Sequence, residues 1–214
     1  MAKIFSAVCT LLLFAAFTPC TTHADPLVIT NGFVTITGFV AGPAYSFAGN
    51  NFAVIGGAGD QGNSTPQAAC FPCPSGAVIN VNGQFVGLSL GQGSATFNGV
   101  VFPNVAFMGT FIFNGPPLIV PFSQSDVILT SPFTFGGHLV GCPLSCGLNP
   151  PVFSVDLVGS GVATLQLRFD GLDQGRPLFS FQSVRYDFEV PEPASILLLS
   201  AGLTALGARL RRRS

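Results

Sequence analysis

Short runs in which apolar and polar residues alternate recur along the whole segment from residue 25 to residue 190. These runs are rich in Val, Ile, Phe and Thr, and Gly, Pro and Asn separate them, whereas no stretch shows the period and caps of an amphipathic helix. Alternation places every second side chain on one face of a strand. The pattern predicts an all-β single domain of about ten to thirteen strands, a two-sheet sandwich or a jelly-roll-like fold.

The clearest alternation covers residues 152–170. A three-residue loop at Gly159-Ser160-Gly161 would place Leu157 opposite Ala163 and bring every apolar side chain of the segment to one face. We therefore predict a hairpin here.

Two other segments carry local signals. Asn31-Gly32 accepts positive φ at both turn positions, which predicts a second hairpin within residues 27–37. Phe179 and Phe181 alternate in the opposite phase to Val184, which predicts a bulge or turn near Gln182-Ser183. A repeated pattern of two aromatic residues before a glycine indicates hairpins rather than a solenoid. The aromatic pairs are Tyr45 and Phe47, Phe111 and Phe113, and Phe133 and Phe135.

Basic residues are nearly absent from the segment from 25 to 190. No lysine or arginine occurs between Lys3 and Arg168, and the segment has three arginines against eight carboxylates, a net charge of −5. A chain without a basic patch cannot neutralise phosphates, which argues against nucleic-acid binding and against peripheral binding to anionic lipid. Nineteen of the 22 phenylalanines lie in this segment and supply apolar surface for a core.

The first 24 residues have the order of a secretory signal peptide. Lys3 precedes an apolar run over residues 4–17, and the small residue Ala24 precedes Asp25. We predict cleavage by signal peptidase between Ala24 and Asp25. The alternatives are an uncleaved anchor helix, although the run is shorter than the ~20 residues that span a bilayer, and a lipid-modified Cys20, although Pro19 fits a lipobox poorly.

A three-part tail occupies residues 190–214. Pro191, Glu192 and Pro193 end the preceding strand, and an apolar stretch over about 194–208 follows them. As a helix with a rise of ~1.5 Å per residue this stretch is about 22 Å long, marginal for a ~30 Å hydrocarbon core. A basic cluster then holds the chain end on the cytoplasmic side. The cluster consists of Arg209, Arg211, Arg212 and Arg213. We expect a short transmembrane helix that pauses in the inner membrane.

This tail resembles the PEP-CTERM sorting signal of Gram-negative bacteria, and the resemblance covers about an eighth of the chain. Members of that class are processed by an exosortase, a membrane cysteine protease, and are associated with exopolysaccharide and biofilm matrix. The resemblance implies a recognition motif and a retention signal. These are Pro191, Glu192 and Pro193, and Arg211, Arg212 and Arg213. It also implies export through the inner membrane to the cell surface, the outer membrane or the extracellular matrix. The alternative is an ordinary tail anchor with an accidental Pro-Glu-Pro.

Four cysteines remain after removal of the signal, in two short motifs. They are Cys70, Cys73, Cys142 and Cys146. An exported chain meets an oxidising periplasm, which favours two structural disulfides. Bridges between the two motifs would close longer loops and stabilise the fold more, so we favour them over bridges within each motif. A four-thiolate zinc site and a redox-active CxxC motif are the alternatives.

No pattern in the sequence predicts a catalytic residue. His138 is the only histidine between residues 25 and 190, so Ser-His-Asp or Cys-His catalysis would have to use it; its strand and turn context indicates a surface or loop histidine. A carboxylate pair for glycoside cleavage is conceivable, but nothing places two carboxylates across a cleft, and solvation explains them better. The candidates are Asp156, Asp170, Asp173 and Asp187.

Acidic, glycine-containing loops at residues 59–63 and 170–175 lack the full ligand spacing of a calcium loop. We therefore expect no metal and no cofactor. These features favour a non-enzymatic protein of the cell surface or exopolysaccharide matrix, with signal peptidase and exosortase as processing partners and exopolysaccharide as a candidate partner. A carbohydrate-binding module is the alternative, and a hydrolase would need a site that the sequence does not show.

Overall fold

The computed structural model describes residues 25–37, 43–57, 63–66, 72–146 and 149–189. The expected signal peptide (1–24), the sorting tail (190–214) and Cys70 lie outside these ranges. The described part is all-β, as the alternation predicts, and no helix in it is long and apolar enough to cross a membrane.

The described residues contain twelve strands. They are β1 (Leu27–Thr37), β2 (Ala44–Gly49), β3 (Phe52–Gly57), β4 (Asn63–Pro66), β5 (Cys73–Pro74), β6 (Val78–Asn80), β7 (Gly83–Phe97), β8 (Val100–Asn114), β9 (Pro117–Ile119), β10 (Val127–Pro143), β11 (Phe153–Asp173) and β12 (Arg176–Glu189).

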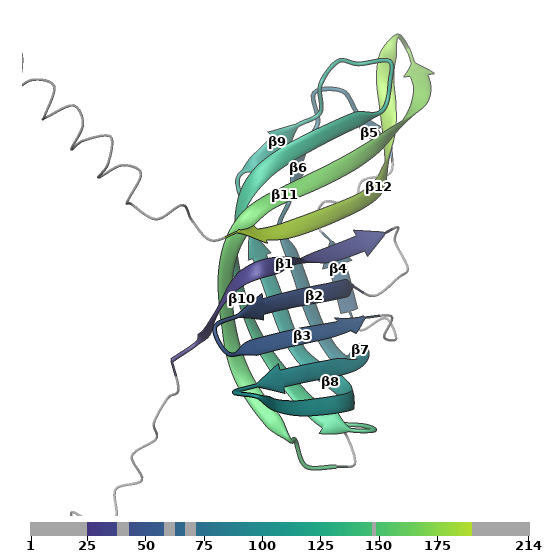
Figure 1. The fold of residues 1–214 in the computed structure, drawn as a ribbon. Coiled ribbons are helices and arrows are strands. Elements are labelled where there is room, and N and C mark those ends of the chain that lie inside the picture. The colour runs from purple at the N-terminus through teal and green to yellow at the C-terminus, as the bar shows by residue number, and fades with distance from the viewer. Residues whose placement is uncertain (1–24, 38–42, 58–62, 67–71, 147–148, 190–214) are drawn as a thin grey trace, which may run out of the picture.

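Ten of these strands form one sheet that closes on itself (Figure 1). Its order is β1-β2-β3-β7-β8-β10-β11-β12, and β1 pairs antiparallel with both β2 and β12. β4 joins β7, β5 joins β12, and β6 and β9 form a separate two-stranded sheet. The prediction of a two-sheet sandwich or jelly roll is therefore wrong, because alternation determines which side chains face inward but not how the edge strands pair.

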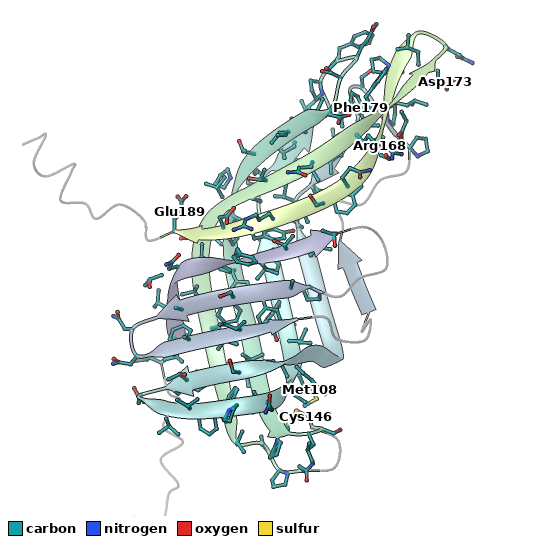
Figure 2. The ribbon with its side chains drawn as sticks, turned by 45° about the vertical axis from the view of Figure 1, so that its right-hand side comes forward. Met108, Cys146, Arg168, Asp173, Phe179 and Glu189 are labelled. Carbon is teal, nitrogen blue, oxygen red and sulfur yellow. A yellow bond between two sulfur atoms is a disulfide. The ribbon has the colours of Figure 1, made fainter. Side chains whose placement is uncertain are left out.

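The last strands extend beyond the closed part of the sheet. β11 has 21 residues, and its final turn with β12 lies far from β1 (Figure 1). Figure 2 shows Arg168, Asp173 and Phe179 in this extension, and Met108 and Cys146 at the opposite end of the molecule. The short strand β5 covers part of the extension by pairing with Leu178 and Phe179.

The core lies inside the closed sheet and is dominated by aromatic rings. All six residues of the three predicted aromatic pairs are buried. The rings of Phe113 and Phe135 have centroids 5.0 Å apart, and those of Tyr45 and Phe111 lie edge to face at 5.3 Å. The pattern therefore marks interior positions. It does not always mark a turn, because Gly137 lies in the middle of β10.

Two buried tyrosines bring their hydroxyl groups into this apolar interior. The hydroxyl of Tyr186 donates a hydrogen bond to the carbonyl of Val81 at 2.6 Å, and its ring stacks on Phe113 at 3.9 Å. The hydroxyl of Tyr45 donates to the carbonyl of Leu90 at 3.2 Å. Burial raises the pKa of both phenols above the ordinary value because the charged form loses its hydration.

The predicted hairpin at Gly159-Ser160-Gly161 is wrong, because β11 runs through it as one strand. Leu157 and Ala163 do share the interior face. They are six residues apart, and this even spacing suits a continuous strand as well as a hairpin. Gly161 is needed for packing: a Cβ there would collide with the backbone carbonyl of Asp187 on β12.

The predicted hairpin at Asn31-Gly32 is also wrong. β1 is continuous, and its register with β2 shifts between Ile29 and Asn31. Gly32 has a φ of 122° and lies against the carbonyl of Ser46, so a positive-φ residue marks an irregular strand rather than a turn.

The predicted bulge near Gln182-Ser183 is confirmed. Gln166 pairs with Ser183, the next residue Leu167 pairs with Phe181, and Gln182 is the extra residue. The bulge reverses the phase of β12, so Phe181 and Val184 are both buried although they are three residues apart.

Candidate functional site

Three polar side chains meet on the outer face of β10 and β11. His138 lies directly opposite Asp156 in the antiparallel register, and Ser154 precedes Asp156 by two residues, on the same face of β11. The Nδ1 atom of His138 is 2.7 Å from Oδ1 of Asp156. The Nε2 atom of His138 is 3.2 Å from Oγ of Ser154. The sheet register thus joins a hydroxyl, an imidazole and a carboxylate in one hydrogen-bonded line.

The carboxylate of Asp156 determines which ring nitrogen of His138 carries the proton. An ionised Asp156 only accepts hydrogen bonds, so Nδ1 of His138 carries the proton of that contact. In the neutral ring Nε2 is then an acceptor, and the hydroxyl of Ser154 donates to it. This is the order of contacts that general-base activation of a serine requires.

The three residues border a cleft of about 550 Å³. Its apolar wall is formed by half-buried phenylalanines, with Phe153 packed between Phe97, at 4.6 Å between ring centroids, and Phe102, at 5.5 Å. Asn98 and Asp25 also line it. A cleft of this size with an apolar wall and a few convergent polar groups is typical of a small-molecule site.

A tight turn presents Asn98 to the cleft. Phe97 pairs with Val100, so Asn98 and Gly99 form a two-residue loop between β7 and β8. Their φ values are 50° and 82°, as in a type I′ turn, which favours the Asn-Gly sequence. The backbone N–H of Asn98 donates to the carbonyl of Asn51 at 2.7 Å, which ties this turn to the turn between β2 and β3.

The site is open to solvent. The side chains of His138 and Asp156 are 49% and 44% exposed. An exposed ion pair contributes little to stability, so the network is not needed to hold β10 to β11, which pair from Val127 to Gly141.

The other candidate aspartates do not gather at this cleft. Asp170 contacts Arg168 at 3.0 Å, and Asp187 contacts Arg185 at 2.7 Å, both within one strand. Asp173 lies at the tip of the extension (Figure 2). These three carboxylates therefore serve surface ion pairs and a turn, as solvation predicts.

In the segment 170–175 the turn predicted from composition is confined to Gln174 and Gly175, because β11 continues to Asp173. Asp173 pairs with Arg176, and the two intervening residues have positive φ, 47° at Gln174 and 81° at Gly175. The other acidic loop, residues 59–63, lies outside the described residues except for Asn63. Within the described ranges no group of three His, Cys, Asp or Glu side chains could hold a metal ion.

The cysteines correct one prediction. Cys142 and Cys146 form a disulfide with each other, so the favoured bridges between the two motifs are wrong. Cys73 is also disulfide-bonded, and its partner is outside the described residues. β10 ends at Pro143, and the chain then turns with Leu144 at a φ of 65°, which brings the two cysteine Cα atoms to 4.9 Å. The bonded sulfurs cannot serve as zinc ligands.

The sequence comparisons address the tail. A family model described as the PEP-CTERM protein-sorting motif matches residues 189–213. The chain carries a PEP-CTERM sorting motif. No curated protein matches the chain, and no solved structure matches it.

The PEP-CTERM match begins where the described body ends. β12 stops at Glu189, which is exposed and pairs with Asn31 of β1. The motif marks an exported, membrane-transiting protein that an exosortase processes. Ala24 and the predicted recognition and retention residues of the PEP-CTERM tail lie outside the described residues. Asp25, the predicted first residue after signal cleavage, is described and exposed.

Sequence reasoning named His138 and Asp156 separately and missed Ser154. The available signal was the pair Ser154-x-Asp156 on the polar face of one strand, since residues two apart project to the same side. What could not be derived is the register that places His138 opposite them.

Proposed function

We propose that the protein is a cell-surface or exopolysaccharide-matrix component that an exosortase releases from its membrane-held tail. The observation that carries the proposal is the junction: the PEP-CTERM match starts at Glu189, the final residue of the last strand. Removal of the residues after the junction would leave every strand pair of the closed sheet intact, because the described strands all end at or before Glu189.

Two features of the segment from residue 25 to residue 190 suit a protein that functions outside the cytoplasm. Cys73, Cys142 and Cys146 are disulfide-bonded, and disulfides persist in oxidising compartments. The net charge of −5 over residues 25–190 disfavours a return to anionic membranes after release.

The experiment compares a tail variant with a matched control in the producing bacterium. Glu192→Ala removes the central residue of Pro-Glu-Pro, and Ser214→Ala changes the last residue, which lies beyond the family match. We expect E192A to accumulate in the membrane fraction as an uncleaved chain, and S214A to be processed and to reach the surface or matrix fraction. Equal processing and equal fractionation of the two variants would refute the proposal.

A second candidate is a carbohydrate-binding module, because the cleft combines aromatic rings with polar groups. Phe97, Phe102 and Phe153 are half-buried there, beside Asn98 and Asp156. Aromatic faces next to hydrogen-bonding groups suit sugar rings. The two tyrosines cannot serve as such platforms because both are buried. Binding on a glycan array by the processed protein, lost in Phe102→Ala, distinguishes a glycan-binding component from a purely structural one.

A further inference from the structure

We propose that Ser154, His138 and Asp156 form the catalytic triad of an acyl-ester hydrolase, with the adjacent cleft as its substrate site. This inference goes beyond the proposed sorting and location and does not depend on them. No sequence pattern predicts an enzyme here, because the three residues become neighbours only through the pairing of β10 with β11.

The contacts have the roles of a triad in the required order. Ser154 Oγ lies 3.2 Å from Nε2 of His138, within reach for proton transfer. Asp156 lies 2.7 Å from Nδ1 of the same ring, where it fixes the tautomer and would stabilise the imidazolium. Each ring nitrogen of His138 therefore contacts the partner that acyl transfer needs.

The cleft supplies space and an apolar wall for the acyl group. Its volume of about 550 Å³ accommodates a small ester, and it is bordered by both members of the nucleophile-base pair. The rings of Phe97, Phe102 and Phe153 would contact a short hydrocarbon chain. An apolar wall and a neutral ester match each other, whereas Asp25 and Asp156 would repel an anionic substrate.

Asn98 carries the one side-chain amide among the residues that line the cleft. Side-chain amides of this type serve in oxyanion holes, and the type I′ turn fixes its backbone. We therefore assign Asn98 the role of a hydrogen-bond donor to the substrate carbonyl oxygen.

The proposed reaction is hydrolysis with water as co-reactant. The oxygen of Ser154 bonds to the ester carbonyl carbon while its proton moves to Nε2 of His138. Collapse of the tetrahedral intermediate breaks the bond to the alcohol oxygen, which takes that proton and leaves. Water then attacks the acyl-serine, gives a proton to His138, and the carboxylic acid departs as the serine oxygen regains the proton. The exposure of His138 gives water access for this second step.

The test uses the processed protein purified from the producing cells, with p-nitrophenyl acetate and butyrate as substrates and a fluorophosphonate as a covalent probe. We expect hydrolysis by the wild-type protein and mass-spectrometric labelling at Ser154. Ser154→Ala should abolish the labelling and lower kcat/KM by about 100-fold or more. Ser183→Ala, on β12 away from the cleft, is the matched control and should keep both.

Two positions test the assigned roles. Asp156→Asn should lower kcat with little change in KM for a neutral ester, because it disturbs the tautomer of His138 while an amide of the same size keeps the shape of the cleft. Asn98→Ala should lower kcat by about 100-fold if its amide meets the oxyanion. Circular dichroism and thermal melts of each variant verify that the closed sheet is intact.

Failure of the triad proposal can be distinguished from failure of the sorting proposal. Absence of labelling and hydrolysis in a folded wild-type protein, or equal rates for wild type and S154A, would overturn the triad whatever the state of the tail. Labelling at Ser154 with loss of hydrolysis in S154A would support it, even if E192A were processed normally.

Discussion

At the scale of single residues, each of the two buried tyrosines has a hydrogen-bond partner for its hydroxyl group. Tyr186 is fully buried, yet its hydroxyl reaches the carbonyl of Val81 at 2.6 Å across 105 positions of sequence. The bond ties the segment before β7 to the last strand. Tyr45 makes a similar but longer contact with Leu90 at 3.2 Å.

Removal of the Tyr186 hydroxyl should therefore be costly. Tyr186→Phe keeps the ring stacked on Phe113 but leaves the carbonyl of Val81 without this donor, so we expect a loss of about 1–3 kcal/mol in the free energy of unfolding. Urea denaturation measures it. Tyr45→Phe, with the longer bond, is the comparison and should lose less; a larger loss there would contradict the ranking.

The same phenols predict the alkaline limit of stability. Burial raises their folded-state pKa above the unfolded value of 10.0, so their contribution is complete below that pH and is lost as the pH rises above it. We expect the free energy of unfolding to fall above about pH 10 more steeply in the wild type than in the double variant Y45F/Y186F. Equal slopes would show that neither tyrosine is linked to folding.

At the scale of elements, alternation predicted strands well and their limits poorly. It predicted the bulge at Gln182 because the phase of the buried residues changes there, and a bulge is the local cause of such a change. It failed at Gly159-Ser160-Gly161 because glycine has two uses that the sequence does not distinguish. It can allow a turn, or, as at Gly161, it can allow a neighbouring strand to approach closely. For the same reason the sequence could name His138 and Asp156 but not their pairing.

The role of Gly161 as a contact point leads to a paired test. Gly161→Ala would place a methyl group against the carbonyl of Asp187, and we expect a loss of about 1–3 kcal/mol in stability as β11 and β12 separate locally. Gly136→Ala on β10 is the control, because a methyl group there would meet no atom within 4 Å, and it should be neutral or slightly stabilising. Thermal melts that rank the two variants the other way would contradict the assignment.

At the scale of the whole molecule, the large sheet is closed by the pairing of its first strand, β1, with β12. β1 forms backbone hydrogen bonds with β2 on one side and with β12 on the other. The edge that β1 and β12 would otherwise expose is therefore closed. The C-terminal end of the described body lies on this seam, since Glu189 pairs with Asn31, whereas Leu27 near the N-terminal end pairs with Leu157 of β11. The described strands all lie between Leu27 and Glu189, so removal of residues 1–24 and 190–214 would leave each of them complete.

The intact mass of the protein from the matrix or surface fraction, with non-reducing peptide mapping, tests the central claim most directly. We predict a chain that begins at Asp25, ends close to Val190 and has no free thiol, with Cys142 linked to Cys146. A mature chain that still contains Arg213 and Ser214 would contradict release by an exosortase, and the protein would instead be a simple tail-anchored one.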